Sequence, residues 1–425
     1  MSNVRTFILV AVCVGMGYIV EPLVFEFGNK DRNKITAVSE IPVVKKEKPK
    51  PMSSLHAEEK QDVDSIPSSL EFSWDRVPLY AHFGVGGGLK PTEYDFLAKN
   101  FSFITLTYGK GTLEGSAETH LTKAASELRK RNKDLTLLYY WASDKPKHQA
   151  KISQQSYPGE FLIRKYKGGT KDIYLDLPRP EVQDWWASVA HKATSEYGFD
   201  GIYMDGATSG RPTGKMNRTL GSEKTAAFDK ATFAMLADAR KRMGQDKLVI
   251  FNPLHGYDQK HKQIGQEYLP ATNGAMIDDF DRDGNQSAEY MANSIKTMTE
   301  AAEKGKIVIF KAWPGFTATY RKKNKDMDPE ECRSQAQKDL LFPLACFLIG
   351  AEKYTYFCYT WGWYPQEGTF EWYPEFDQAL GPPKGKAIQE GWIFRREFEH
   401  ASVFVDLNTR NAKIDWRGKK DELLH

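Results

Sequence analysis

The chain has 425 residues, of which 40% are hydrophobic and 13% aromatic, so it can bury a large core. The formal net charge is only +3, and the total charge therefore gives no reason to expect a nucleic-acid partner. The four cysteines, Cys13, Cys332, Cys346 and Cys358, fit neither a zinc spacing nor a dense disulfide framework. We expect the last three to be small buried residues.

The N-terminal segment predicts export. One arginine precedes an apolar run at 6–20, which is shorter than the roughly 20 residues of a spanning helix and is typical of a signal-peptide core. No clean cleavage site follows, so residues 1–28 are expected to be a signal peptide or a membrane anchor. Residues 29–74 are charged and contain proline, which predicts a flexible linker. We expect the protein to be secreted, periplasmic or membrane-anchored, facing outside the cytoplasm.

From residue 78 onward, short apolar runs alternate with helical patterns, as in parallel β/α folds. Strands are predicted at 78–83, 103–108, 135–141, 201–205, 248–252, 275–279, 307–313 and 354–361. Helices are predicted between them at 118–131, 179–197, 224–243, 288–304 and 329–350. Eight strands predict a single (β/α)8 TIM barrel over residues 75–416, which includes a short C-terminal β-hairpin at 392–416. A doubly wound open sheet is the alternative, but no nucleotide fingerprint supports it.

Polar and aromatic residues end every predicted strand, where barrel enzymes carry their chemistry. The expected substrate-binding residues are Tyr80, His82, Tyr108, Tyr140, Trp141, Asp144, Asn252, His255, Lys311, Trp313, Trp361 and Trp363. Such a set predicts a concave polar pocket whose aromatic walls stack on sugar rings.

Asp205 is the best single candidate for catalysis. Alternation along a strand places it on the same face as Tyr203. The structural alternative is a carboxylate that caps the next helix. A long loop at 206–221 follows instead of an immediate helix, which favours the catalytic interpretation.

The sixth strand supplies a second carboxyl group. Asp278 is in phase with Met276, whereas its neighbour Asp279 faces the other way. Glycosidic cleavage needs one carboxyl group as acid and another as nucleophile or base. We therefore expect Asp278 as the acid and Asp205 as nucleophile or base, with Asp279 and Glu267 as reserve acids. The acidic loop after Asp278 lacks the complete calcium pattern, so we expect no metal and no cofactor.

Four motifs carry a resemblance to a known family: FDGIYMDG (199–206), AMIDDF (275–280), YLDLPRPEVQDWW (174–186) and REFEHASVFVDL (396–407). The chain resembles hypothetical glycoside-hydrolase-like TIM barrels, distantly similar to α-galactosidase-type enzymes and endo-fucanases, over about residues 75–410. The resemblance implies that Asp205 is the nucleophile. In such families the sixth-strand acid is often Glu, and here the shorter Asp278 stands in its place, as in the Asp–Asp pairs of the α-galactosidase-like clan.

The loops expected around the pocket are basic. Residues 144–172, 206–221 and 314–326 carry more lysine and arginine than acid. A basic rim concentrates anionic ligands, which predicts an anionic polysaccharide or oligosaccharide substrate, sulfated or uronic. Ordinary solvated loop charge is the alternative explanation.

Three other functions stay open at this point. One is a barrel that binds glycans without cutting them. Another is a polysaccharide lyase, for which Tyr80, His82 and His255 supply candidate bases. A phosphosugar isomerase or aldolase is the third, with Lys311 as a Schiff-base lysine, but aromatic residues occupy the place of its phosphate site.

Overall fold

The structure is a computed structural model. It describes residues 7–8, 24–25, 66–67, 70–86, 88–108, 116–143, 159–167, 170–207, 221–257, 264–282, 284, 286–317 and 327–418. The chain divides into two compact units, Met1–Ser54 and Leu55–His425. The first contains β1 (Phe7–Ile8) and β2 (Val24–Phe25), which pair antiparallel, and the remainder of the predicted leader lies outside the described residues. Among the described helices, none combines the length and apolarity that a membrane crossing requires.

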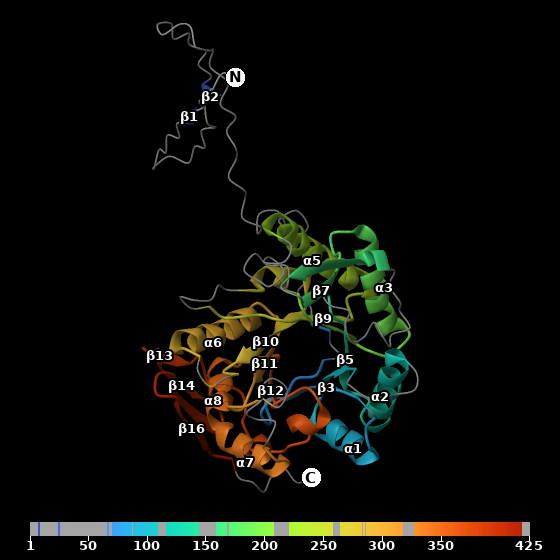
Figure 1. Ribbon diagram of the computed structural model, residues 1–425. Coiled ribbons are helices and arrows are strands. Elements are labelled where there is room, and N and C mark those ends of the chain that lie inside the picture. The colour runs from blue at the N-terminus through green and yellow to red at the C-terminus, as the bar shows by residue number, and fades with distance from the viewer. Residues whose placement is uncertain are drawn as a thin grey trace, which may run out of the picture. The chain divides into compact units, whose positions relative to one another are not determined.

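The second unit is built on eight parallel strands (Figure 1). They are β3 (Tyr80–Gly84), β4 (Phe103–Thr107), β5 (Thr136–Tyr140), β8 (Gly201–Met204), β9 (Leu248–Phe251), β10 (Gly274–Phe280), β11 (Ile307–Ala312) and β12 (Thr355–Tyr359). Each pairs with the next, and a parallel bridge between Leu79 and Phe357 brings the last strand beside the first. The predicted barrel is confirmed, with every predicted strand found within two residues of its expected ends.

Helices surround this sheet (Figure 1). They are α1 (Pro91–Asn100), α2 (Ala117–Arg131), α3 (Pro180–Ser195), α5 (Ser222–Met243), α6 (Ala288–Glu303), α7 (Pro329–Asp339) and α8 (Leu341–Gly350). A 3₁₀ segment, η3 (Gln266–Ala271), lies between β9 and β10 and packs on α5. The helix predicted at 329–350 breaks at Leu340, because Pro343 has no N–H to bond Asp339 and its ring crowds that carbonyl.

The inside of the barrel is a packed core. Inward side chains from alternate strand positions form one cluster, whose largest members are Tyr80, Phe103, Tyr203, Met276 and Tyr356. Leu70 and Phe72, from the segment predicted to be a linker, pack against the same cluster. Outward side chains join a second cluster shared with the helices. Because the interior is filled, polar chemistry is confined to the ends of the strands.

The C-terminal extension is larger than the predicted hairpin. It is an antiparallel sheet of β13 (Ile388–Glu390), β14 (Ile393–Glu397), β15 (Ala401–Asp406) and β16 (Asn411–Trp416), packed on α8. Buried Arg396 donates to the carbonyls of Leu348, Ile349 and Ala351 at the end of α8. The last carbonyls of a helix lack the usual N–H partners four residues further on, so the guanidinium caps α8 and anchors the sheet.

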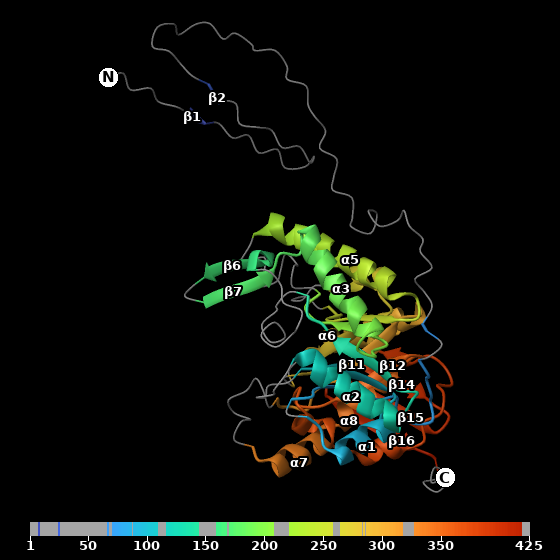
Figure 2. The same ribbon diagram turned by 90° about the vertical axis from the view of Figure 1, so that its right-hand side faces the viewer.

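A β-hairpin that the sequence did not predict overlaps the end of the basic stretch at 144–172. Strands β6 (Leu162–Lys167) and β7 (Thr170–Leu175) form an antiparallel hairpin between β5 and α3. Figure 2 shows the hairpin projecting beyond the helices.

Candidate active site

Two carboxyl groups meet at the C-terminal ends of the central strands. Asp205 directly follows β8, Asn252 directly follows β9, and Asp278 lies near the end of β10. The Asn252 side-chain Nδ2 donates to Asp205 Oδ1 at 2.9 Å and to Asp278 Oδ2 at 3.5 Å. One amide from the fifth barrel strand therefore joins carboxyl groups from the fourth and the sixth. The expected phase is confirmed, since Tyr203 and Met276 both lie in the inward cluster.

Asp205 is held by three donors. Tyr140 donates its hydroxyl to Oδ2 at 2.6 Å, and the Gly206 backbone N–H and the Asn252 amide both donate to Oδ1 at 2.9 Å. A carboxylate that only accepts hydrogen bonds is well matched to these partners. Both oxygens are thereby oriented, which is what a nucleophile or base at this position requires.

Asp278 has the opposite surroundings. Part of the side chain reaches solvent, but its Oδ1 is enclosed and has no hydrogen-bond partner among the described residues. Burial, followed by the nearby carboxyl groups of Asp279 and Asp205, raises the pKa of Asp278 to about 7, against the opposing charges of Lys311 and Arg282. A carboxyl group that keeps its proton near neutral pH can serve as a general acid.

Lys311 forms the buried cationic part of the site. Its Nζ donates to Thr360 O at 2.6 Å and Thr360 Oγ1 at 2.8 Å, and lies 3.7 Å from the ring centre of Trp313 and 5.4 Å from that of Trp363. Burial lowers the pKa of Lys311 to about 8, although nearby Asp278 raises it. Threonine and indole groups thus hold this lysine, rather than the direct carboxylate pair that a buried lysine often forms.

His82 completes the aromatic wall. Its ring centre lies 4.7 Å from the ring centres of both Tyr203 and Trp363. Burial, reinforced by the positive charge of Lys311, lowers the pKa of His82 to about 3. The imidazole is therefore neutral at physiological pH, and a neutral ring adds no further positive charge beside Lys311.

The loop after β10 is fixed from two sides. Trp313 Nε1 donates to the Asp278 carbonyl at 2.7 Å, and Arg282 donates to Asp279 Oδ1 at 3.0 Å. The Arg282 guanidinium also lies 4.9 Å from the ring centre of Trp313. Asp279, one of the two reserve acids, is therefore engaged in an ion pair with Arg282.

Several predicted site residues lie elsewhere. Trp141 and Trp361 belong to the outward cluster, where Trp141 donates to the Trp186 carbonyl. Glu267 lies in η3, the segment that packs on α5. Alternation explains both tryptophans, because Trp141 follows the inward Tyr140 and Trp361 is in phase with the outward Tyr359. Trp363 reaches the inward cluster because it lies beyond the end of β12, where the alternation no longer holds.

Four other residues were predicted to bind substrate or to act as a lyase base: Tyr80, His255, Tyr108 and Asp144. Tyr80 is buried in the barrel interior and donates to Thr105, and burial raises its pKa well above the usual range, which makes it unsuited as a lyase base. His255 Nδ1 lies 3.3 Å from the Tyr290 hydroxyl. Tyr108 is half-buried after β4, and Asp144 lies outside the described residues.

The structure thus gathers a subset of the predicted residues around Asp205 and Asp278: Tyr140, His82, Asn252, Lys311, Trp313 and Trp363. Thr360 and Arg282 are additional members that the sequence did not single out. No group of three or more potential metal-binding side chains occurs in the described part of the chain.

An eight-stranded barrel that carries two carboxyl groups at its strand ends has the layout that many glycoside hydrolases use. Residues 139–402 match the model of a family described as Hypothetical glycosyl hydrolase family 15, and the chain belongs to that family. The predicted resemblance to glycoside-hydrolase-like barrels is confirmed. A search of curated proteins gives no match.

Solved glycoside hydrolases are among the similar structures. The glycoside hydrolase domain of PelA from Pseudomonas aeruginosa is 14% identical, with 66% of this chain and 94% of that chain covered and a TM-score of 0.42. The α-galactosidase TtGalA from Thermus thermophilus is 15% identical, with 81% of this chain and 69% of that chain covered and a TM-score of 0.42. An Anoxybacillus α-amylase is 12% identical, with 80% of this chain and 88% of that chain covered and a TM-score of 0.45.

The raised pKa of Asp278 predicts a pH-dependent stability. An unfolded-chain aspartate loses its proton near pH 3.9, about three units before folded Asp278 does. The unfolded state therefore binds fewer protons over this range, so the free energy of unfolding should fall as pH rises from about 4 to 7. Asp278→Asn should remove this component. Urea unfolding at about pH 4.5, 6 and 7.5 would measure it.

Asp279→Asn is the matched control. It removes a carboxylate that raises the pKa of folded Asp278, so the fall should still begin near pH 4 but end at a lower pH than in the wild type. Parallel curves for the wild type and Asp278→Asn would show that Asp278 ionises normally in the folded protein.

Proposed function

We propose that the protein is a glycosidase that cleaves glycosidic bonds of a polysaccharide, with Asp205 as nucleophile and Asp278 as general acid. The observation that carries this proposal is the sharing of one Asn252 amide by the two carboxyl groups. The different surroundings of the two groups support the division of roles. Asp205 accepts three hydrogen bonds, whereas Asp278 is protonated up to about neutral pH.

The short separation favours a retaining reaction. The bonded oxygens of Asp205 and Asp278 lie 2.9 and 3.5 Å from the same nitrogen, so they cannot be farther apart than those two lengths placed end to end. This limit on the nearest oxygens lies just under the roughly 6.5–9.5 Å between the two carboxyl groups of inverting enzymes, so we propose the retaining route, in which the groups are about 5–5.5 Å apart. In the retaining route, Asp205 attacks the anomeric carbon while Asp278 protonates the departing oxygen. Asp278 then takes a proton from the water that releases the sugar from Asp205.

The proposed substrate is an anionic polysaccharide, sulfated or uronic. Support comes from the excess of basic residues at 144–172, 206–221 and 314–326, most of which lie outside the described residues. Within the described site, Lys311 and Arg282 are the cations near Asp278, and Trp313 and Trp363 provide faces for sugar rings.

Substitution of the two aspartates should give different losses. Asp205→Asn should abolish turnover of polysaccharides and of activated aryl glycosides. Asp278→Asn should slow polysaccharide cleavage by roughly 10²–10⁴-fold. The kcat/KM of aryl glycosides should change much less, since a good leaving group needs no proton in the step that forms the glycosyl-enzyme. Reducing-end assays on algal and plant polysaccharides, beside aryl glycoside assays, would measure both.

The pH profile and the product provide the controls. Because Asp278 must carry a proton, kcat/KM should fall as pH rises through about 7, and Asp278→Asn should lose this limb. Proton NMR should show that the first product keeps the anomeric configuration. Full activity of Asp205→Asn would refute hydrolysis by this pair, and glycan binding without turnover in the wild type would indicate a non-catalytic binding protein.

The charge of the substrate can be tested with salt. For a sulfated fucan or polygalacturonate, KM should rise several-fold between about 0.05 and 0.5 M NaCl, because salt screens attraction to the basic loops. The value of kcat should change little. A neutral polysaccharide serves as the control. A KM that is independent of salt for every cleaved anionic substrate would exclude the anionic class.

A further inference from the structure

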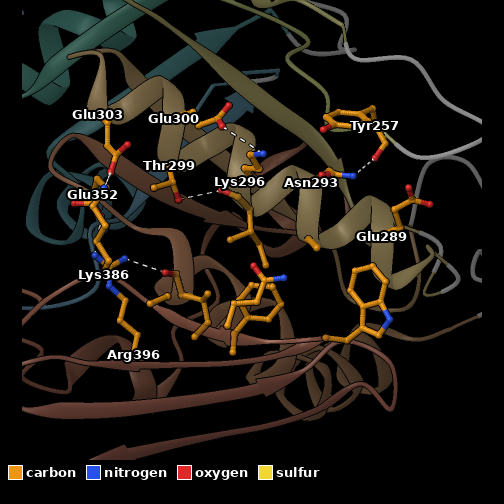
Figure 3. A pocket seen from close by; sticks show the side chains of 17 residues that line it. Tyr257, Glu289, Asn293, Lys296, Thr299, Glu300, Glu303, Glu352, Lys386 and Arg396 are labelled. Atoms are coloured by element: carbon orange, nitrogen blue, oxygen red, sulfur yellow. Dashed lines mark hydrogen bonds and ion pairs between the residues drawn. The ribbon is translucent and has the colours of Figure 1, made fainter.

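A groove of about 580 Å³ lies on the flank of the barrel, between α6 and strands β13 and β14 (Figure 3). This volume is within the roughly 300–1,000 Å³ typical of small-molecule sites. Its apolar lining includes Ile295 on α6, Ile349 on α8 and Phe394 on β14. The groove is thus formed jointly by the barrel and the C-terminal sheet.

Exposed aromatic side chains gather at this groove. Four large hydrophobic side chains are exposed in the described part of the chain, and two of them, Tyr257 at 37% and Trp392 at 41%, line the groove. A third, Ile388, belongs to β13 beside it. Such a concentration on one face marks an interaction site more often than scattered exposure does.

The charges of the groove are nearly balanced. Lys296 pairs with Glu300 at 3.7 Å, Lys386 with Glu303 at 2.5 Å, and Arg396 with Glu352 at 2.8 Å (Figure 3). Glu289 adds one more carboxylate to the lining. Three paired cations and one surplus acid give an anionic ligand no net attraction, whereas side chains of this kind hydrogen-bond well to uncharged hydroxyl groups.

A short stretch of chain connects the groove to the active site. Tyr257 follows the bridging Asn252 by five residues, which places their Cα atoms within about 18 Å even if the chain is fully extended. Gly256 presses against α6, where a Cβ would lie 2.6 Å from the Ser294 nitrogen. Asn293 donates to the Tyr257 carbonyl at 2.6 Å. The end of the groove at Tyr257 is therefore held in a fixed position close to Asn252 along the chain.

We propose that this groove is a second glycan-binding site on the flank of the barrel, which holds uncharged sugar units that lie between the charged units of the proposed polysaccharide. Trp392 and Tyr257 supply flat faces for the sugar rings, and the neighbouring amides and carboxylates bind their hydroxyl groups. The choice of a glycan rests on the proposed function. The site acts on long chains and is not required for cleavage itself.

Affinity electrophoresis in native gels that contain amylopectin, galactomannan or dextran tests this site. At least one of these neutral polysaccharides should retard the wild type, and Trp392→Ala should weaken the binding about tenfold. Leu341→Ala is the matched control, because Leu341 is 40% exposed but does not line the groove. Asp205→Asn should be retarded like the wild type, and added NaCl should have little effect.

The outcomes separate this site from the catalytic proposal. Retardation that depends on Trp392 in a protein without turnover would support the groove and refute the glycosidase. No retardation in any of the three gels, or equal retardation of Trp392→Ala and the wild type, would overturn the groove whatever the activity.

A separate observation concerns the turn between β15 and β16. Arg410, in this turn, pairs with the almost fully buried Asp281 three residues after Asp278. Both Asp281 (φ 54°) and Arg410 (φ 58°) adopt the left-handed conformation that is uncommon for residues other than glycine. Gln286 accepts the Asp281 N–H at 2.7 Å and donates to the Asp279 carbonyl. The family match ends at residue 402, before this turn.

We infer that Arg410 is a positioning residue, through which the C-terminal sheet fixes the loop that follows Asp278 and thereby the end of β10. Arg410→Met should lower kcat by roughly 10–100-fold with little change in KM, because a small displacement of a catalytic group is costly. A loosened loop admits water to Asp278, so the basic limb of kcat/KM should move to lower pH. Arg417→Met is the control, since Arg417 forms an exposed ion pair with Glu397 in the same sheet.

Hydrogen exchange of residues 278–286 supplies a readout that does not need activity. Exchange should be faster in Arg410→Met than in Arg417→Met. Faster exchange with unchanged kcat and pH limb would overturn the positioning role and leave the proposed function intact. Unchanged exchange would overturn the contact itself. Inactivity of the wild type on all substrates would refute only the glycosidase.

Discussion

The whole site depends on one amide that stands between two acids. Asn252 Nδ2 donates to both Asp205 and Asp278, and its strand, β9, lies between the strands that carry them. Two carboxyl groups held this close cannot both ionise without a large repulsion. Asp278 is the group that retains the proton, first because it is buried with an enclosed Oδ1, and then because three donors stabilise the charge of Asp205. The proposed nucleophile and the proposed acid are thus two identical side chains in different surroundings.

Burial of the surrounding ionisable groups extends this asymmetry. Lys311 lies deep between indole rings and bonds to Thr360, and its charge lowers the pKa of both His82 and Asp278. Because His82 stays neutral, Lys311 remains the buried positive charge that partly offsets the acids. Moving this lysine outward would therefore alter the proton affinity of Asp278 without any direct contact between the two side chains.

Much of this arrangement was predictable from strand alternation. The period of two correctly paired Asp205 with Tyr203 and Asp278 with Met276 on the inner face. The same rule, applied to β5, predicts that Trp141 points outward once Tyr140 points inward. The prediction that Trp141 binds sugar rested only on the presence of an indole at a strand end and did not use the alternation. Pro343 likewise marks the break between α7 and α8.

Other parts could not be predicted, because they depend on register between distant strands. The contact of Lys311 with Thr360 arises from the parallel pairing of β11 with β12, in which Lys311 lies opposite Cys358. The two hydrogen bonds of Asn252 require that the ends of β8, β9 and β10 lie at matching heights along the barrel axis. Neither height nor register is encoded in a local pattern, because both emerge when the barrel closes.

The C-terminal sheet shows how a peripheral element can bear on the site. Arg396 binds the carbonyls at the last turn of α8, and Arg410 lies over the ring of Phe342 in its first turn. The sheet is therefore fixed at both ends of one helix, and that helix connects the strand of Lys311 to the strand that leads to Trp363. Both contacts restrain the sheet against α8, so the contact from Arg410 to Asp281 gives the loop that follows Asp278 a defined position. The fixed sheet also borders the groove opposite α6, so the same attachment supports both the proposed glycan site and the placement of the proposed acid.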